Sequence, residues 1–352
     1  MSVTLPQRAV NRQARRVMVR EWEPSMASDA EVAAVVDLLN AAVEVDTPGD
    51  PPWIQDGFRE YVATTMPGER RAAWVVGEPG GPLLGYAMML LMDDMGVFEL
   101  SVHPAARRHG VGSALLLAAA RRASDEGIPS LGIEVVGGTS AVRFYEQHGF
   151  RWAFAEMRNV LDLSTVDWQK LGEMARGIGS GYRVEYYPGG PPEELYPAYA
   201  AAKESVRGDD PGDLELRPSS YDPERLRDSL ATLHARGLKP YIVVAIHEST
   251  ETVAGLTEVV VPRQRPSRAD QYDTVVVPQH RGYGLGRALK ARMLFELRAA
   301  EATLREVQTW HDTENEPLLK VNAELGFQPD REWREYEIEV ADLLHRLRPA
   351  VI

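Results

Sequence analysis

The chain has 352 residues, contains no cysteine and carries a formal net charge of −13. This length is typical of two domains, and 44% hydrophobic residues supply enough apolar surface for two cores. The acidic balance argues against a nucleic-acid or anionic-membrane binder, because such proteins cluster lysine and arginine. It suits a small cationic partner, and it equally suits a charge that only keeps the protein soluble. The absence of cysteine excludes disulfides, thiolate metal sites and a cysteine nucleophile.

The first 16 residues are rich in arginine and glutamine and lack an apolar core, so we expect a flexible leader over 1–16 rather than a secretory signal. No apolar run approaches the roughly 18 residues that a membrane span requires. We therefore expect a cytoplasmic protein without membrane contact. The eight histidines have no paired spacing, so we expect no metal site.

Hydrophobic periodicity predicts alternating strands and helices over a first domain, residues 17–163. The predicted strands are 17–22, 74–76, 83–91, 95–102, 131–136 and strand structure within 152–163. The predicted helices are 29–43, 58–65, 113–126 and 139–148. Gly127 and Pro129 end the third of these helices, and Gly149 ends the fourth.

A linker over 164–181, partly helical and glycine-rich at its end, precedes a second domain, residues 182–345. The same order of elements recurs there. The predicted strands are 182–187, 241–246, 253–261, 272–277, 306–310 and 333–340, and the predicted helices are 192–204, 223–236, 287–302 and 316–325. The repeated order indicates one fold present twice.

A shared motif supports the repeat. The pattern V-x-P-x-x-R-x-x-G-x-G runs over 102–112 and again over 276–286, and each half later carries a Gly-Phe pair, at 149–150 and 326–327. Each motif follows a predicted strand and opens a helix. Glycines let a backbone approach closely and a helix N-terminus attracts anions, so this loop is typical of a phosphate site. A tight turn from strand to helix also favours glycine without any ligand. The spacing matches neither a P-loop nor a dinucleotide fingerprint.

These residues resemble the GNAT superfamily of acyl-CoA N-acyltransferases, whose loop reads [RQ]-x-x-G-x-[GA] after a V-x-P segment. The resemblance implies an α/β (α+β) fold of two tandem domains, each a splayed, mostly antiparallel mixed sheet flanked by helices. It implies acetyl-CoA as cosubstrate, no metal, and a small-molecule amine as acceptor. It carries no implication of nucleic-acid or membrane binding, and either a monomer or a homodimer is compatible.

The resemblance also implies residues for acetyl-CoA. The strand before each loop would pair with the pantetheine arm, and the loop would cradle the pyrophosphate. In the first half these residues are Leu100, Val102, Arg107, Arg108, His109, Gly110, Val111, Gly112 and Ser113. In the second half they are Val276, Arg281, Gly282, Tyr283, Gly284, Leu285, Gly286 and Arg287. Each loop arginine could equally be a solvated surface residue.

Acyl transfer needs an uncharged amine and a proton for the leaving thiolate. Glu99 resembles the family's carboxylate base on the strand before the loop, and Asp273 stands at the matching position of the second half. Tyr145 resembles the tyrosine that protonates the thiolate, whereas the second half has Asn322, which has no titratable proton. Each carboxylate could instead be solvated or ion-paired, and the tyrosine could be a packing residue.

The first half thus has the fuller catalytic set, so we expect direct acetyl transfer there. Tandem chains of this layout resemble mycothiol synthases and antibiotic-modifying N-acetyltransferases, and the former favour the second half as catalytic. A tandem peptidyl ligase that uses aminoacyl-tRNA is a rival, opposed by the acidic charge and the intact loops. A non-catalytic acetyl-CoA sensor is another rival, favoured by Asn322 and opposed by Tyr145.

Overall fold

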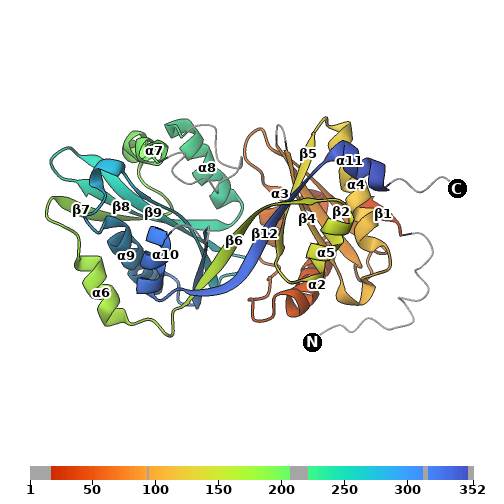
Figure 1. The fold of residues 1–352 in the computed structure, drawn as a ribbon, viewed down its shortest axis with the longest axis horizontal. Helices are drawn as coiled ribbons and strands as arrows, with labels where there is room; N and C mark the ends of the chain where they lie inside the picture. The colour runs from red at the N-terminus through yellow and green to blue at the C-terminus, as the bar shows by residue number, and fades with distance from the viewer. Residues whose placement is uncertain (1–16, 93–94, 207–220, 312–315, 348–352) are drawn as a thin grey trace. The chain divides into compact units, whose positions relative to one another are not determined.

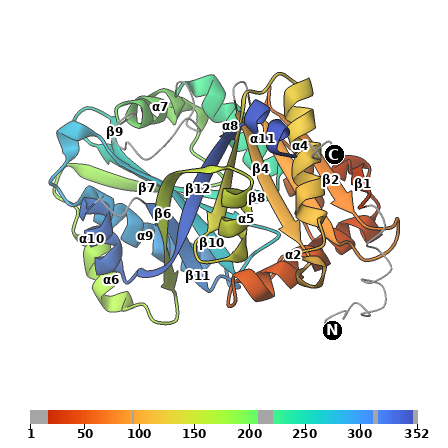
Figure 2. The same cartoon turned by 45° about the vertical axis from the view of Figure 1, so that its right-hand side comes forward.

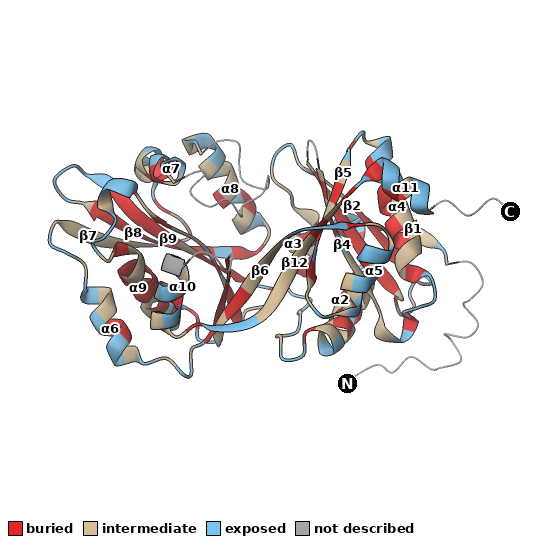
Figure 3. Ribbon diagram, in the orientation of Figure 1, coloured by how far each residue is buried: buried red, intermediate tan, exposed pale blue. Residues whose placement is uncertain are grey.

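The computed structural model describes residues 17–92, 95–206, 221–311 and 316–347, without the side chains of 316–318; the predicted leader lies outside the described residues. The chain divides into two compact units (Figure 1). Residues up to 155 together with those from 332 on form unit 1, and residues 156–331 form unit 2. In each unit helices cover both faces of a sheet, and some strands of each sheet are largely buried (Figure 3).

Unit 1 holds six strands in the order β1-β2-β3-β4-β5-β12. They are β1 (Val19–Glu21), β2 (Arg70–Val76), β3 (Gly85–Leu91), β4 (Met95–Val102), β5 (Ser130–Val136) and the end of β12 (Gln328–Glu339). Strands β4 and β5 run parallel and the other pairs are antiparallel. The mixed, mostly antiparallel sheet confirms the predicted fold class.

Helices α2 (Asp29–Asp46) and α3 (Phe58–Ala63) cover one face of this sheet, and α4 (Val111–Asp125) covers the other. Figure 2 shows α4 lying across the strands, and α11 (Val340–Leu347) packs against it. The short helices are η1 (Pro24–Met26), η2 (Pro104–Ala106) and α5 (Ser140–Gln147). Strand alternation explains both cores, since Ala73 and Val75 face α2 while Ala72 and Trp74 face α4.

Unit 2 repeats this architecture with the strand order β6-β11-β10-β9-β8-β7. The strands are β6 (Arg151–Asp162), β7 (Tyr182–Pro188), β8 (Leu238–His247), β9 (Thr252–Pro262), β10 (Arg268–Val276) and β11 (Glu306–His311). The helices are α6 (Trp168–Arg176), η3 (Glu193–Leu195), α7 (Tyr196–Glu204), α8 (Pro223–Ala235), η4 (Pro278–His280), α9 (Leu285–Ala300) and α10 (Glu316–Leu325). Helices α7 and α8 cover one face, and α6 and α9 the other.

The unit boundaries differ from the linear domains 17–163 and 182–345, because the last strand of each half pairs in the other unit. In unit 1, β5 pairs with residues 333–339 of β12. In unit 2, β11 pairs with residues 157–162 of β6. Two similar strands can fill either sheet edge, so local pattern alone does not select the partner.

Most predicted elements are confirmed, with ends that move by a few residues. Strand β2 begins at Arg70 instead of residue 74, and β10 begins at Arg268 instead of residue 272. Helix α4 begins at Val111 directly after the loop. The C-terminal helix α11 was not predicted, although its buried Val340 and Leu343 have helical spacing.

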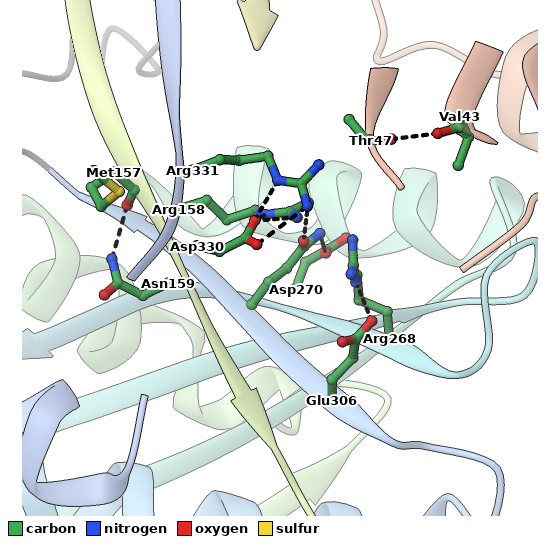
Figure 4. Close-up of polar contacts among 11 residues, drawn as sticks. Val43, Thr47, Met157, Arg158, Asn159, Arg268, Asp270, Glu306, Asp330 and Arg331 are labelled. Atoms are coloured by element: carbon green, nitrogen blue, oxygen red, sulfur yellow. Dashed lines mark hydrogen bonds and ion pairs between the residues drawn. The ribbon is translucent and has the colours of Figure 1, made fainter. Parts of the chain in front are cut away.

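Unit 2 contains a network of charged side chains from β6, β10 and β12 (Figure 4). Arg158, 2% exposed, donates Nε to Asp330 at 2.7 Å, and Arg331 donates to the same carboxylate at 2.7 Å. Asp270 accepts from the Gln308 amide at 2.6 Å, and burial raises the pKa of Asp270. These ion pairs and hydrogen bonds offset the free-energy cost of removing the charged groups from water.

Candidate active site

A cleft opens in unit 1 where β4 and β5 separate. Their pairing covers only Met95–Phe98 against Ser130–Ile133, although both strands continue. On its other side β4 stays paired with β3 as far as Val102. The backbone of β4 after Phe98 is therefore free of β5, and a cavity of about 370 Å³ lies against Leu100, Ser101 and Val102.

The glycine-rich loop forms one end of this cavity. Arg108 (φ 65°) and Gly110 (φ 82°) both have left-handed backbone conformations, which turn successive N–H groups inward. No side chain caps the N-terminus of α4, whose N-cap is Gly110. The first N–H groups of the helix are thus available to an anion, as a phosphate site requires.

The guanidinium group of Arg107 bonds to other groups of the protein. It forms a two-pronged ion pair with Asp46 at the end of α2, with Nη1 and Nη2 at 2.8 and 2.6 Å from the carboxylate oxygens. Its Nε donates to the Val102 carbonyl at 3.1 Å. Arg107 therefore fixes the loop to β4 and α2, and Arg108 is the loop arginine with an exposed side chain.

Helix α5 supplies the opposite wall. Tyr145, 3% exposed, lines the cavity between the rings of Phe144 and Phe150, at centroid distances of 5.0 and 5.1 Å. Burial, with a contribution from the Glu99 carboxylate, raises the pKa of Tyr145. The phenol therefore stays protonated throughout the neutral range.

Glu99 stands on β4 opposite Met88 of β3, and its side chain is exposed. It lies on the sheet face that carries α2 and α3 and precedes the residues that line the cavity. Its charge nevertheless raises the pKa values of both Tyr86 and Tyr145, after burial as the larger cause. Glu99 is thus electrostatically coupled to the cleft.

Comparisons with known proteins converge on one family. The model of the acetyltransferase (GNAT) domain matches residues 69–152. Mycothiol acetyltransferase of Actinosynnema mirum is 28% identical over 273 residues, 74% of this chain and 82% of that protein. The enzyme of the same name from Kineococcus radiotolerans is 26% identical and covers 74% and 79%. The tandem GNAT protein of the clavulanic acid biosynthesis pathway, solved without AcCoA, is 25% identical with a TM-score of 0.79, covering 92% of this chain and 99% of that one.

Residues 69–152 match the GNAT acetyltransferase domain, and the chain resembles a tandem GNAT protein over 92% of its length. An N-acetyltransferase activity and the tandem architecture follow, and the GNAT fold implies the use of acetyl-CoA. The GNAT protein of Sphaerobacter thermophilus shares the fold, with 18% identity, a TM-score of 0.66, and coverage of 96% and 97%. In the described parts of the chain, no helix is long and apolar enough to cross a membrane, and no group of residues has metal-binding geometry.

The second GNAT unit reproduces the loop. Strand β10 pairs with β11 only over Arg268–Asp270. Gly282 (φ 85°) and Gly284 (φ 75°) have the same left-handed conformations as Arg108 and Gly110. Arg281 donates Nε to the Val276 carbonyl at 3.2 Å, the counterpart of the contact from Arg107.

The remaining predicted loop residues of unit 2 have mixed surroundings. Tyr283 is 57% exposed, and Leu285 packs in the core. Arg287 is ion-paired with Glu324 at 3.1 Å. Gly286 has room, since an added Cβ would meet its nearest neighbour, Val276, at 3.5 Å. The backbone of this GNAT loop is therefore suited to an anion, while Arg287 is committed elsewhere.

Asp273 is ion-paired instead of standing free as a base. Lys203 of α7 lies 2.7 Å from Asp273 and 2.8 Å from Glu258, and Tyr199 donates a hydrogen bond to Glu258. Burial would lower the pKa of Lys203, but the two carboxylates outweigh it and raise this pKa. The Lys203 ammonium is thus the ion-pair partner of both carboxylates, Asp273 and Glu258, in unit 2.

Asn322 occupies the place in unit 2 that Tyr145 has in unit 1. In both units a Phe N–H closes the same turn, from Phe150 to the Tyr145 carbonyl at 3.1 Å and from Phe327 to the Asn322 carbonyl at 3.0 Å. Asn322 is 1% exposed, and neither atom of its amide group has a hydrogen-bond partner. The second GNAT cleft therefore offers no tyrosine proton at this position.

Sequence reasoning found part of the first cleft and missed another part. The predicted residues that line the cavity are Leu100, Val102, Arg107, Arg108, Gly110, Gly112, Ser113 and Tyr145. Glu99 and His109 are exposed and Val111 is buried in the core, so none of these three predicted residues lines the cavity. The missed lining residues are Asp46, Ser101, Ser140, Ala141, Phe144, Gln147 and His148. Helical spacing from Tyr145 could have indicated those on α5.

Proposed function

We propose that unit 1 transfers an acetyl group from acetyl-CoA directly to the primary amine of a small molecule. The observation that supports this most is one cavity of about 370 Å³ that joins the free part of β4, the phosphate-type loop and Tyr145. Unit 2 has the loop but neither a free carboxylate at 273 nor a tyrosine at 322. The acceptor is a cytoplasmic metabolite, and the enzyme acts as a monomer or homodimer without nucleic-acid or membrane partners.

The loop and β4 hold acetyl-CoA. The pyrophosphate accepts hydrogen bonds from N–H groups at the start of α4, and Arg108 adds a positive charge. The pantetheine arm runs along Leu100–Val102, whose backbone β5 leaves free. Gly112 permits this path because an added Cβ would meet Phe144 at 3.2 Å and narrow the cleft.

Glu99 acts as general base, directly or through water, and removes a proton from the ammonium form of the acceptor. The neutral amine attacks the thioester carbonyl, a C–N bond forms, and the C–S bond breaks. Tyr145 hydrogen-bonds to the leaving sulfur and donates its proton to the thiolate. The raised pKa of Tyr145 keeps this proton in place until a negative charge develops beside it.

Unit 2 serves as a binding and structural unit. Because the Lys203 ammonium is already ion-paired with both Asp273 and Glu258 and offsets one of their two charges, a cationic acceptor gains less there. The names of the mycothiol acetyltransferase relatives favour a second candidate, in which the acceptor is the amine that these enzymes acetylate. The resemblance of the layout to mycothiol synthases would place the catalysis of this candidate in unit 2. Lys203 and Asn322 oppose that assignment of the catalytic half.

The first test is calorimetric titration of the full chain with acetyl-CoA after removal of bound cofactor. We expect binding that Gly112→Trp abolishes in unit 1, together with loss of acetyl transfer to a panel of small amines. Gly286→Trp is the matched change in unit 2 and should leave acetyl transfer intact. Loss of transfer on Gly286→Trp but not on Gly112→Trp would assign catalysis to unit 2, and no binding at all would overturn the proposal.

A further inference from the structure

Two side chains in the unit 1 cleft form a hydrogen-bonded pair that the acetyl-transfer chemistry does not use. The Ser113 hydroxyl lies 3.1 Å from Nε2 of His148, and Nδ1 of His148 lies 2.8 Å from the Phe144 carbonyl oxygen. Ser113 and His148 both line the cavity. A carbonyl oxygen only accepts, so Nδ1 must carry a hydrogen, which fixes the tautomer of the neutral ring.

The fixed tautomer makes the direction of the Ser113 hydrogen bond depend on one proton. In the neutral ring Nε2 is an acceptor, so the Ser113 hydroxyl donates its hydrogen to His148. In the protonated ring Nε2–H becomes the donor, and the Ser113 hydroxyl hydrogen is released toward another acceptor. The proton on His148 thus decides whether Ser113 presents a lone pair or a hydrogen to the cleft.

We propose that Ser113 and His148 form a proton-controlled donor for a phosphate of acetyl-CoA, so that cofactor binding and protonation of His148 favour each other. Ser113 lies in the first turn of α4, beside the N–H groups that attract an anion. This inference rests on the proposed function, since it takes the loop of unit 1 as the site of the acetyl-CoA phosphates. It adds a binding residue, His148, that the loop motif does not contain.

Among the described residues that line the cavity, the charged groups include no unpaired carboxylate, so a bound phosphate can stabilise the protonated form of His148. In the cavity lining, the carboxylate is that of Asp46 on α2, and Arg107 already neutralises it. Arg108 of the loop adds positive charge. Helix α5 itself carries Arg143 and Glu146, and Glu146 accepts from Tyr336 of β12 at 3.1 Å. Arg346 of α11 packs on Gly149, next to His148. A bound phosphate would therefore be the main negative charge that favours His148 protonation.

Unit 2 provides an internal comparison. Motif alignment puts Arg287 and Leu325 at the positions of Ser113 and His148. Arg287 is paired with Glu324, and Leu325 is 3% exposed in the core. Of the two units, only unit 1 therefore has a serine and a histidine at these positions.

The test compares the wild type with His148→Gln, which keeps a polar side chain that does not titrate. Dissociation constants for acetyl-CoA are measured by calorimetry between about pH 5.5 and 8. Relative to His148→Gln, the wild type should gain about tenfold in affinity on acidification, as expected for a charge-assisted hydrogen bond. Titrations at fixed pH in two buffers of different ionisation enthalpy should show proton uptake that His148→Gln lacks. S-acetylpantetheine, which has no phosphates, should bind both proteins with the same pH profile.

Two further variants make the outcome decisive. Ser113→Ala should remove the gain on acidification although the imidazole remains, and the exposed His345→Gln on α11 should match the wild type. Equal pH profiles for wild type and His148→Gln, or a full gain in Ser113→Ala, would overturn the inference while acetyl-CoA still binds. Failure of the wild type to bind acetyl-CoA would instead overturn the proposed function.

Discussion

At the scale of single residues, Tyr145 and Tyr86 allow a matched test of catalysis, since both are 3% exposed in unit 1. Tyr145→Phe should lower kcat about a hundredfold, because a general acid contributes at least this factor, and it should leave the KM for acetyl-CoA nearly unchanged. Steady-state kinetics with the best amine acceptor measure both constants.

Tyr86→Phe is the control for that prediction. The Tyr86 hydroxyl is buried without a hydrogen-bond partner, and its ring packs edge-on against Trp22 at 5.8 Å. Its removal should therefore preserve activity and stability. Equal kcat values for Tyr145→Phe and the wild type would exclude Tyr145 as the acid.

Lys290 of α9 gives a second prediction at this scale. It is 2% exposed, lies 5.5 Å from the Phe327 ring centroid, and burial lowers its pKa to about 7. Because the unfolded chain holds this proton up to the ordinary lysine pKa, the stability of the wild type should rise as pH increases from about 7 toward 10. Lys290→Met should remove this rise and raise the free energy of unfolding at pH 7 by a few kcal/mol, since each unit of pKa shift corresponds to about 1.4 kcal/mol.

Urea unfolding at pH 7 and pH 9, followed by circular dichroism, measures this effect. The same substitution at the exposed Lys170 of α6 should change neither value. A Lys290→Met protein that is less stable than the wild type at pH 7 would show that the ammonium has a stabilising partner in the folded chain.

At the scale of elements, both units pack a helix tightly onto a glycine of the sheet. At Gly85 of β3 an added Cβ would lie 2.6 Å from Val111 and 2.8 Å from Leu115 of α4. At Gly255 of β9 it would lie 3.3 Å from Leu289 of α9, and 2.8 Å from the Val275 carbonyl oxygen of the neighbouring strand β10. These glycines let the loop and helix approach the strands in each unit.

Gly85→Ala should therefore lower the free energy of unfolding by about 2 kcal/mol through overpacking. It should also weaken acetyl-CoA binding, because Val111 is the first residue of α4 and moves with the loop. Gly179→Ala is the matched control, since nothing lies within 4 Å of its added Cβ. Thermal unfolding and calorimetry measure both effects, and an affinity equal to the wild type would uncouple the helix position from the loop.

At the scale of the whole molecule, the exchanged strands predict how the chain can be divided. A fragment of residues 17–163 leaves the β5 edge without the 333–339 segment of β12. We expect it to aggregate, because an unpaired buried edge invites association. Residues 17–155 joined by a glycine-serine linker to 332–347 should instead unfold cooperatively and bind acetyl-CoA.

Size-exclusion chromatography and thermal unfolding distinguish these two proteins. The control is the same fusion with Tyr336→Asp and Ile338→Asp, because these side chains are 2% and 3% exposed in the core of unit 1. It should fail to fold. A monomeric, cooperative 17–163 fragment would mean that the end of β6 can fill the β5 edge in place of β12.

The sequence by itself determined the tandem repeat, the fold class, most helices and strands, and both loops. Burial periodicity and glycine conformation are local properties, and β4, α4 and the loop between them follow from adjacent residues. The left-handed Gly110, Gly282 and Gly284 belong to this local information.

The tertiary structure decided which partners these local elements meet. The exchange of β6 and β12, the pairing of Arg107 with Asp46, and the pairing of Lys203 with Asp273 join residues far apart in the sequence. Equivalent strand edges and exposed charges have several possible partners, and periodicity does not distinguish among them. The choice depends on which pairing satisfies the backbone groups and charges that packing removes from water.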